Sequence, residues 1–476
     1  MRIIANVYID GEFAVPHGRE ALVLVDPATE RETTTVILAD ELDARRAIAA
    51  AKAAFLAFSQ TSRAERMEWL QALSNAVAAA EADIVEVMVA EYGGTMAMAQ
   101  GTARRAAASF SLARKVLADY AFEREVGGAR MRMLPHGVVG MITPWNANTG
   151  FIASKLAMAI ASGSTSVIKP SELSAAQTEL ITRVLHGAGL PPGVFNIVTG
   201  RGDTVGAEIA RHPDIAKISF TGSTAVGKAI ARTAVDSMKR VTLELGGKSP
   251  TVFLDDADFA KAMPLAAMAA VMNSGQACIA GTRLLVPRSR LAEASELAVR
   301  AFDALVVGPT HDPRVNVGPM VTRKQWERVQ GYIERGVAEG ATLLAGGPGR
   351  PAGLERGWFV RPTVFGEVRN DMAIAREEIF GPVLCIIPYD SDEDALAIAN
   401  DTPYGLHGYV FGADPARTRK IADGIQAGRV FINGLYDIPE APFGGVKQSG
   451  LGREFGVFGF EEYLEPKAIM GHDTRL

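Results

Sequence analysis

Apolar residues recur at three- and four-residue steps through most of the first third of the chain. The Ala-rich stretches that follow this spacing lie at residues 39–58, 63–90 and 101–117. Such spacing is typical of amphipathic helices, and Ala is the best helix former. We therefore expect the first third of the molecule to be helical.

From Gly137 onward the pattern changes to short apolar runs that alternate with helical stretches. The apolar runs lie at 138–142, 165–168, 194–198, 216–220 and 241–243, and the helical stretches at 151–161, 175–186, 204–211 and 225–233. Strands and helices that alternate in this way predict right-handed crossovers in a mostly parallel sheet.

A second alternating block follows the first. Its helical stretches lie at 258–272 and 290–305, and its apolar runs at 283–286, 383–389 and 410–412. Gly246, Gly247 and Pro250 interrupt the helical spacing and the strand-like apolar runs alike. We therefore expect two α/β domains that meet near residues 246–250. Gly347-Pro348-Gly349 has no flanking strand and helix, and we interpret it as a surface loop.

Composition narrows the class of protein. The 476 residues carry 49 basic and 54 acidic side chains, and the net charge of −5 offers no bulk attraction to nucleic acid. No apolar run reaches the ~18 residues of a membrane span, and Asp10 interrupts the N-terminus before a signal-peptide core could form. We expect a multi-domain cytoplasmic protein with no nucleic-acid or membrane partner.

The two cysteines, Cys278 and Cys385, are too few for a disulfide framework or a four-thiolate metal site. The seven histidines also lack metal-ligand spacing, so no metal is predicted.

Two turns between a strand and a helix are candidates for binding a nucleotide. They lie at 200–206 and 220–227. Glycines at the carboxyl ends of parallel strands let a ligand approach the backbone, and helix N-termini offer free N–H groups. Neither turn is G-x-G-x-x-G, so spacing alone leaves ordinary turns as an equal alternative.

Lys169 and Glu172 follow the apolar run at 165–168. Three residues apart at the end of a strand, they could hold the two hydroxyls of a ribose, one as donor and one as acceptor. A carboxylate there would repel a 2′-phosphate and favour NAD over NADP. The alternative is a solvated loop pair.

Cys278 lies among small, polar, turn-prone residues at 273–281, whereas Cys385 lies inside an apolar run. A lone cysteine is usually a buried small hydrophobe, which suits Cys385 better than Cys278. No histidine occupies a recognisable partner motif. Glu244, before Gly246-Gly247, is the other candidate base; the sequence leaves a paired structural carboxylate equally open.

Together these motifs resemble the NAD(P)-dependent aldehyde dehydrogenase family over nearly the whole chain. The matching stretches are YIDGEF, TPWNANT, KPSE, ISFTGSTAVGK, LELGGKSP, NSGQACIAG, EEIFGPV and PFGGVKQSGLGRE, in that order. The resemblance implies an α/β fold with a Rossmann-like cofactor-binding domain (1–118 and 136–246). It also implies a second α/β catalytic domain (247–447) and a small β oligomerisation flap (119–135 and 460–476).

The resemblance also implies roles for the catalytic residues. Cys278 would be the nucleophile that forms a thiohemiacetal and then a thioester, and Asn146 would stabilise the oxyanion with the Cys278 N–H group. Glu244 would activate the water that releases a free carboxylic acid. Glu454 matches a second glutamate near the water path, with a structural ion pair as the alternative.

By the same resemblance, the cofactor is NAD, with NADP as the second choice. The residues that match cofactor contacts are Thr143, Trp145, Lys169, Ser171, Glu172, Gly202, Gly206, Phe220, Ser223, Leu245, Gln325, Glu378 and Phe380.

The substrate implied is a small aldehyde, aliphatic or aromatic, without a distal acid. The residues that match the tunnel are Ala147, Gly150, Phe151, Ser154, Ile279, Leu435, Tyr436 and Phe443. Ala147 and Gly150 are small, which suggests a wide entrance.

A hairpin at 122–134, turning at Gly127-Gly128, and a strand at 461–470 match the flap, so we expect a homodimer or homotetramer. Two other functions stay open: a cofactor-independent cysteine esterase or hydrolase, and a catalytically silent binding protein. The silent relative would be expected to lose Cys278, Glu244 or Asn146.

Overall fold

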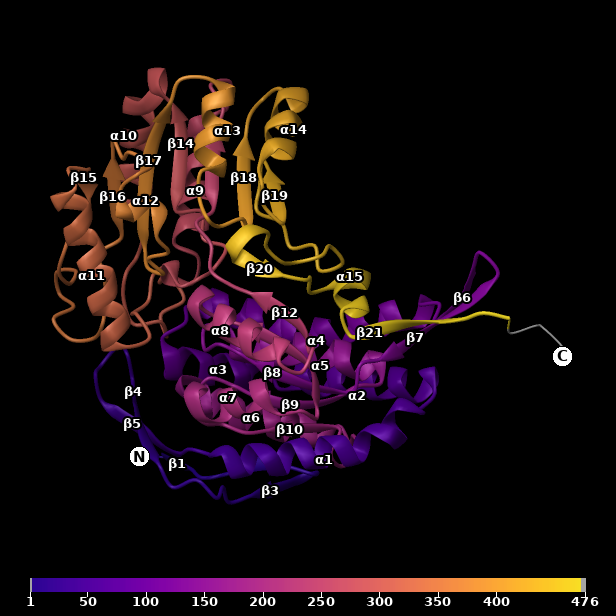
Figure 1. The fold of residues 1–476 in the computed structure, drawn as a ribbon. Coiled ribbons are helices and arrows are strands. Elements are labelled where there is room, and N and C mark those ends of the chain that lie inside the picture. The colour runs from indigo at the N-terminus through magenta and orange to yellow at the C-terminus, as the bar shows by residue number, and fades with distance from the viewer. Residues whose placement is uncertain (1, 472–476) are drawn as a thin grey trace.

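A computed structural model describes residues 2–471, and within them two large sheets account for most of the strands (Figure 1). The first has eight strands in the order β20-β12-β11-β8-β9-β10-β2-β3. Its parallel strands are β12 (Arg240–Glu244), β11 (Ile215–Thr221), β8 (Val138–Ile142), β9 (Thr165–Lys169) and β10 (Phe195–Ile197). Antiparallel strands flank them: β20 (Gly450–Leu451) at one edge, and β2 (Val7–Ile9) and β3 (Glu12–Ala14) at the other.

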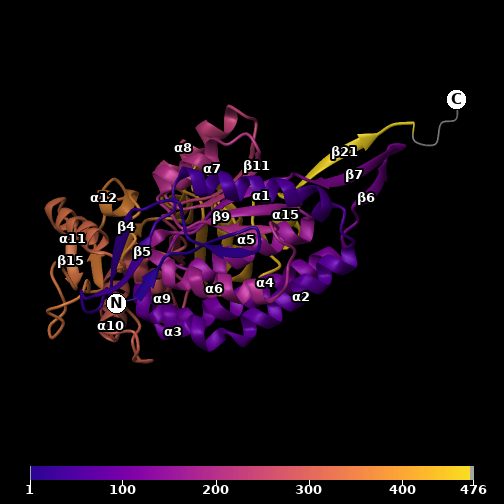
Figure 2. The same cartoon turned by 90° about the horizontal axis from the view of Figure 1, so that it is seen from below.

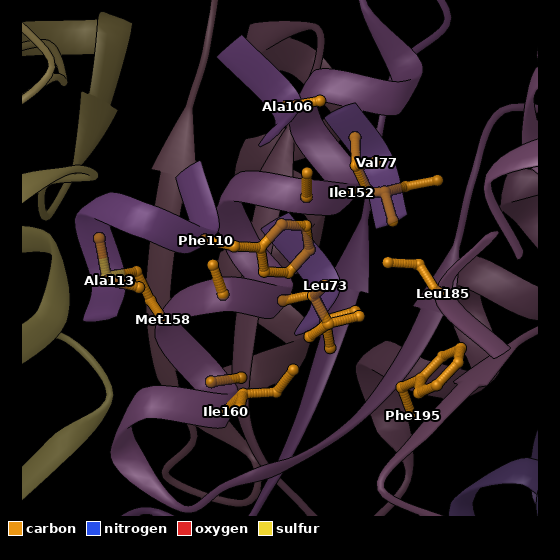
Figure 3. Packing of buried hydrophobic residues seen from close by; sticks show 14 of the residues in the cluster. Leu73, Val77, Ala106, Phe110, Ala113, Ile152, Met158, Ile160, Leu185 and Phe195 are labelled. Carbon is orange, nitrogen blue, oxygen red and sulfur yellow. The ribbon is translucent and has the colours of Figure 1, made fainter. Parts of the chain in front are cut away.

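Alternation along β8 assigns the two faces of this sheet. Val139 and Met141 pack into a cluster with helices α2–α6, whereas Val138 and Ile142 pack into a second cluster with α1, α7 and α8. Figure 3 shows the first cluster, where Phe110 and Leu73 meet Ile152 and Leu185. The helices of that face are α2 (Arg63–Ala79), α3 (Glu81–Tyr92), α4 (Met96–Asp119), α5 (Asn148–Ser162) and α6 (Ala175–Gly187). Those of the other face are α1 (Glu41–Ser59), α7 (Ala207–Arg211) and α8 (Thr224–Val235). A layer of helices on each face of a parallel sheet is the doubly wound arrangement that the sequence predicts.

The second sheet has seven strands in the order β15-β16-β17-β14-β13-β18-β19. These are β15 (Thr342–Ala345), β16 (Thr363–Gly366), β17 (Val383–Tyr389), β14 (Arg283–Pro287), β13 (Pro250–Phe253), β18 (His407–Phe411) and β19 (Arg429–Ile432). Within the described part of this second sheet, only the β15–β16 pair is antiparallel. The last strand of the first crossover series, β12, is followed directly by β13 of this sheet, so residues 245–249 connect the two sheets.

Helices cover both faces of the second sheet as well. On one face are α9 (Phe259–Ala270) and α10 (Leu291–Asp303), and on the other are α11 (Arg323–Ala338), α12 (Ala373–Arg376), α13 (Asp392–Asn400) and α14 (Pro415–Gly424). Cys385 is fully buried in the core on the α11 side, as its apolar surroundings predict.

Two small sheets complete the fold. At the N-terminus β1 (Arg2–Ile4), β5 (Glu32–Ile37) and β4 (Ala21–Val25) pair in that order. The other small sheet pairs β21 (Leu464–Ile469), β7 (Ala129–Pro135) and β6 (Glu123–Val126), and Figures 1 and 2 show it projecting from the body of the molecule. The helix α15 (Gly456–Glu461) leads into β21. Residues 472–476 of the expected flap lie outside the described residues.

The prediction of a helical first third is wrong for residues 2–37, which form β1 to β5. These strands have only three to six residues each, too few for a local periodicity to mark them. The stretch at 63–90 is also two helices, because the chain turns at Ala80 (ψ 11°) between α2 and α3.

Among residues 2–471, no helix is both long and apolar enough to cross a bilayer. The same residues contain no group of three or more His, Cys, Asp or Glu side chains placed to hold a metal ion.

Candidate active site

Cys278 lies on a tightly wound loop after α9. The short 3-10 turn η3 (Met272–Gly275) contains Asn273 at φ 51° and Ser274 at φ 60°, both in the left-handed region. Gly275 follows at φ 75°, and a Cβ there would lie 2.1 Å from the carbonyl carbon of Gly381. Three successive left-handed residues are costly and persist only where surrounding contacts enforce them. The small and polar residues around Cys278 are therefore what this turn requires.

Buried hydrogen bonds enforce that turn. The Tyr92 hydroxyl donates to Asn273 Oδ1 (3.0 Å), and Ser274 Oγ accepts from the Gly318 N–H group (2.8 Å). Gln276 Oε1 accepts from the Val321 N–H group (3.0 Å). Sequence reasoning missed the positioning roles of Tyr92 and Gln276, because their partners are 181 and 45 residues away along the chain.

Asn146 meets the Cys278 loop from the other sheet. Its Nδ2 donates to the carbonyl of Gln276 (2.9 Å), two residues before Cys278, and its own carbonyl accepts from Asn273 Nδ2 (3.1 Å). The side chain is buried. Asn146 and Cys278, which are far apart in the sequence, are thus brought together.

Glu244 ends β12 with its side chain in the protein interior. Only 2% of the residue is exposed, and neither carboxyl oxygen has a hydrogen-bond partner among the described residues. A Cβ at Gly444 would lie 2.7 Å from Glu244 Oε1, so only glycine fits beside it without displacing the carboxyl group. Burial, and then the charge of Glu454, raises the pKa of Glu244 well above its ordinary value.

The Gly246-Gly247 pair lets Glu378 and the Cys278 loop approach the end of β12. The Gly247 N–H group donates to Glu378 Oε1 (3.1 Å), and a Cβ at Gly247 would lie 2.4 Å from the carbonyl oxygen of Cys278. A Cβ at Gly246 would lie 2.5 Å from Glu378 Oε2. Burial, followed by the charges of Glu378 and Glu244, raises the pKa of the Cys278 thiol.

Glu454 is held by a lysine that sequence reasoning missed. Lys155 on α5 is fully buried, pairs with Glu454 Oε1 and donates to Ser219 Oγ (2.9 Å). Ser219 and Thr221 lie opposite Thr242 and Glu244 in the β11–β12 register, so polar side chains line this face of the two strands. One signal was available: Lys155 is the single charge in the otherwise apolar stretch 151–161, and a buried charge needs a partner.

In the pair at the end of β9, Lys169 is buried and Glu172 is partly exposed. Lys169 Nζ donates to Glu172 Oε2 (3.2 Å), and the NH1 group of Arg201 lies 3.7 Å from Glu172 Oε1. Burial lowers the pKa of Lys169, against the opposing effect of the Glu172 charge. Ser171 caps the next turn by accepting from the Leu173 N–H group (3.3 Å).

The two candidate nucleotide turns differ in how closely they pack. Gly206 lies near the pair, since a Cβ there would be 3.8 Å from Lys169 Cδ, whereas a Cβ at Gly202 would meet nothing within 4 Å. In the second turn Ser223 caps α8 by accepting from the Val226 N–H group (3.4 Å). There glycines also allow close packing, because a Cβ at Gly222 would lie 2.5 Å from the Phe220 ring and one at Gly227 would lie 2.4 Å from Leu245.

The Gln325 side chain is hydrogen-bonded to the backbone at Phe380. Its Nε2 donates to the carbonyls of Phe380 (2.8 Å) and Ile379 (3.2 Å), which leaves its Oε1 as the group available to a ribose. Phe380 itself has φ 62°. The Trp145 ring lies edge-on to Phe380, with centroids 5.9 Å apart. Thr143 Oγ1 donates to Asn148 Oδ1 (3.1 Å).

The residues matched to the substrate tunnel come from several elements. Ala147 precedes α5, on which Gly150, Phe151 and Ser154 lie, and Ile279 follows Cys278. Leu435, Tyr436 and Phe443 belong to the segment after β19. A Cβ at Gly150 would lie 3.3 Å from Thr102 of α4, so a glycine at this position also lets α5 and α4 pack closely.

The three residues in the segment after β19 differ in exposure. Tyr436 is 52% exposed and donates to the carbonyl of Ile432 (3.1 Å). Phe443 exchanges two backbone hydrogen bonds of 2.7 Å with Glu454. Leu435 packs against the core on the α9 side of the second sheet.

Taken together, the site has a cysteine thiol on a rigid loop, an amide donor beside that loop and a buried carboxyl group that no described residue hydrogen-bonds. Such a set can form and resolve a covalent adduct with a carbonyl carbon. The basic and acidic groups at the end of β9 and the capped turn before α8 can hold a dinucleotide.

Comparison with known proteins places the chain in a family with this class of site. The family model described as "Aldehyde dehydrogenase family" matches residues 14–469. The 3-succinoylsemialdehyde-pyridine dehydrogenase of a Pseudomonas species is 43% identical over 475 residues, which cover 99% of this chain and 100% of that protein.

Solved structures agree. Aldehyde dehydrogenase C from Pseudomonas syringae, a Cys-to-Ala mutant in complex with NAD+ and octanal, superposes with a TM-score of 0.97 at 46% identity, covering 98% of this chain and 96% of that chain. A Mycobacterium tuberculosis aldehyde dehydrogenase complexed with NAD+ gives a TM-score of 0.95 at 37% identity, covering 98% of both chains. The chain therefore belongs to the aldehyde dehydrogenase family and shares its mixed α/β fold with Rossmann-like parallel sheets.

Proposed function

We propose that this enzyme oxidises an aldehyde to the free carboxylic acid through a thiohemiacetal and a thioester on Cys278, with NAD as the preferred oxidant. The observation that supports this most strongly is the buried, unpartnered carboxyl group of Glu244, which lies close enough to Cys278 to raise the pKa of its thiol. Without a partner, Glu244 is free to exchange a proton with water or substrate.

The first step is the addition of Cys278 Sγ to the aldehyde carbon, which forms a C–S bond while the thiol proton leaves to the Glu244 carboxylate or to water. The carbonyl oxygen becomes an oxyanion. Asn146 Nδ2 and the Cys278 N–H group are the donors proposed to stabilise it, and Asn146 already lies against the loop through Gln276. Removing one such donor in other enzymes costs about 3 kcal/mol.

The second stage releases the acid. Bound NAD would supply the hydride acceptor that turns the thiohemiacetal into a thioester. Glu244, whose carboxyl group has by then passed any proton on to solvent, takes a proton from water as the water attacks the thioester carbon. The C–S bond breaks, and the Cys278 sulfur regains a proton. Because Glu244 can act here, we expect hydrolysis and not transfer of the acyl group to a thiol such as coenzyme A.

The chain's own residues suit a dinucleotide. Lys169 and Glu172 offer a donor and an acceptor for the adenosine ribose hydroxyls, and Ser223 caps the N-terminus of α8, where a pyrophosphate would meet free N–H groups. Glu378 is proposed to hold the nicotinamide ribose beside Gly246-Gly247, and Glu172 to favour NAD over NADP.

For the substrate we propose an aliphatic or aromatic aldehyde without a distal acid. Octanal in the related P. syringae structure supports an apolar chain. The tunnel residues proposed are those named above, without a basic side chain among them.

We propose further that the chain forms a homodimer or homotetramer through the sheet β21–β7–β6. All four residues of β6 are exposed, and β6 and β21 are edge strands of a sheet that projects from the body (Figure 1). Exposed edges are hazards unless they pair. The domain limits proposed are 1–118 with 136–246, 247–447, and 119–135 with 460–476.

The test is steady-state turnover of a panel of aldehydes with NAD, monitored by the absorbance of reduced nicotinamide, together with identification of the acid. Production of one equivalent of free acid per NADH supports the proposal. Turnover of an activated ester without any aldehyde oxidation would show a cofactor-independent hydrolase instead.

A further inference from the structure

The loop between β8 and α5, which carries Asn146, is joined to α6 by a chain of buried hydrogen bonds. The Thr143 hydroxyl donates to Asn148 Oδ1 (3.1 Å), and Asn148 Nδ2 donates to Thr178 Oγ1 (2.9 Å). The Thr178 hydroxyl then donates to the carbonyl of Ser174 (2.8 Å). Because a hydroxyl has a single hydrogen, Thr178 can only accept from Asn148, and the direction of each of these bonds is fixed.

The chain of bonds returns to the loop at Trp145. Ser174 is the N-cap residue of α6, and its Oγ donates to the Trp145 carbonyl (3.3 Å). The loop is therefore held on both sides of Asn146, at Trp145 directly before it and at Asn148 two residues after it. The four residues whose side chains make these bonds are each at most 4% exposed. Hydrogen bonds in such a low-dielectric interior are stronger than those in water.

Asn148 links the loop to the helix α6. It is the first residue of α5, where an asparagine commonly bonds the backbone of its own helix. Both side-chain groups of Asn148 instead bond partners outside that helix, Thr143 in the loop and Thr178 on α6. The side chain is thus a bridge between two elements and not a helix cap.

The position of this loop decides where the Asn146 amide points. An amide nitrogen has two hydrogens, and the Gln276 carbonyl accepts a hydrogen bond from Asn146 Nδ2 (2.9 Å). The second hydrogen is the one that an oxyanion on Cys278 would accept. Such a donor is effective within about 2.7–3.1 Å of the oxyanion, so a small displacement of the loop would weaken it while the amide is still present.

We propose that Asn148 and Thr178 are positioning residues, which hold the loop so that the Asn146 amide meets the oxyanion. Both act through Asn146 and not by contact with the substrate. The proposal rests on the proposed function, which gives Asn146 its role as the oxyanion donor.

The experiment compares two threonines of α6 that differ in one bond. Thr178 and Thr182 are both buried, and the hydroxyl of each donates to the carbonyl four residues earlier, at 2.8 and 2.6 Å. Among the described residues, only Thr178 of the two also accepts from Asn148. Thr178→Val and Thr182→Val therefore lose the same kind of helix bond, but only Thr178→Val breaks the link to the loop. The kcat, the KM for NAD and the thermal unfolding midpoint are measured for each.

We expect Thr178→Val to lower kcat about tenfold, since misplacing a group by about 1 Å can cost a hundredfold and other supports of the loop remain. Thr182→Val should keep the wild-type kcat, although both variants should lower the unfolding midpoint alike. The KM for NAD should stay near the wild-type value in both. Thr178→Ser, which keeps the hydroxyl, should restore kcat.

A double-mutant cycle separates positioning from a general loss of structure. In the Asn146→Ala background, adding Thr178→Val should lower kcat no further, because the amide that Thr178 positions is already absent. Asn148→Ala breaks the chain of bonds from the loop side. It should give the same fall in kcat, again with no further effect in the Asn146→Ala background, and it tests the proposal if Thr178→Val does not fold.

Three results would overturn the proposal: a wild-type kcat in Thr178→Val and Asn148→Ala, an equal loss in Thr182→Val, or effects of Thr178→Val and Asn146→Ala that multiply. A raised KM for NAD at unchanged kcat would also overturn it, because the chain of bonds would then position cofactor contacts. If Asn146→Ala alone keeps the wild-type kcat, the oxyanion role is wrong, and the fault lies with the proposed function.

Discussion

Two carboxyl groups at the same edge of the first sheet, the partly exposed Glu172 after β9 and the buried Glu244 at the end of β12, have opposite surroundings. Glu172 lies between Lys169 and Arg201, whereas Glu244 has no hydrogen-bond partner among the described residues. Accordingly, the pKa of Glu244 is raised by burial and by Glu454. A paired carboxylate holds a fixed charge and suits binding, whereas an unpaired one can gain and lose a proton and suits catalysis.

Within the catalytic centre, too, some groups are held by hydrogen bonds and others are left free to exchange a proton. The loop before Cys278 is fixed by Tyr92, Ser274 and Gln276, but the thiol itself has neighbours that oppose its ionisation. Because the thiolate is the nucleophile, a thiol with a raised pKa needs a base that takes its proton as the C–S bond forms. The site therefore combines fixed geometry with groups whose protonation can change.

The most disruptive way to test this contrast is to remove the nucleophile. Cys278→Ala should abolish aldehyde oxidation, with a loss on the order of 10⁶-fold, as removal of a nucleophile does in other covalent enzymes. It should also abolish any esterase activity. Cys385→Ala is the control, because Cys385 is buried in the core of the second sheet. Oxidation that persists without Cys278, measured by NADH formation, would refute its role.

Removing the unpaired carboxyl group should have the next largest effect. Glu244→Gln keeps the shape of the side chain but cannot accept a proton, so steady-state turnover should fall by roughly 10²- to 10⁴-fold. The first turnover should still release NADH, which stopped-flow absorbance would record as a burst. A normal steady-state rate would contradict the role of Glu244 as the base.

The oxyanion donor should matter less than the base. Asn146→Ala removes the amide that lies against the Cys278 loop, and kcat should fall about a hundredfold. Because Asn146 Nδ2 also holds the Gln276 carbonyl, the thermal unfolding midpoint should be measured alongside. A lower midpoint with unchanged kcat would assign Asn146 a structural role only.

The smallest predicted effect is a shift in pH dependence. Glu244 is active as a base when ionised, so turnover should rise with pH through its raised pKa. Glu454→Gln removes a negative neighbour and so lowers that pKa, which should move the rising limb of the kcat profile to lower pH by about one unit. Glu461→Gln, in the nearby α15, is the control. A limb that does not move, or moves to higher pH, would show that Glu454 does not act on Glu244.

Much of this arrangement could be predicted from local pattern. The apolar run at 138–142 is β8, and the two turns after β10 and β11 lead into helices as expected. These features depend on residues close in sequence, where strand and helix periods and glycine positions are informative. The resemblance to the family then supplied the predicted roles of the site residues, which the experiments above test.

What could not be predicted depends on distant contacts. The short strand β2 joins the first sheet by pairing with β10, far along the chain, and α11 was missed altogether. Lys155 and Arg201 gain their importance from Glu454 and Glu172, which approach them only in the folded chain. Gln325 matched a ribose contact by position, yet its amide nitrogen is committed to the Phe380 carbonyl.

The most direct test of the account is rapid-quench mass spectrometry of the Glu244→Gln variant mixed with NAD and an aldehyde. The account predicts one equivalent of NADH and an acyl group on the peptide that contains Cys278, stable because its hydrolysis is slowed. NADH without any acyl group on Cys278 would contradict it.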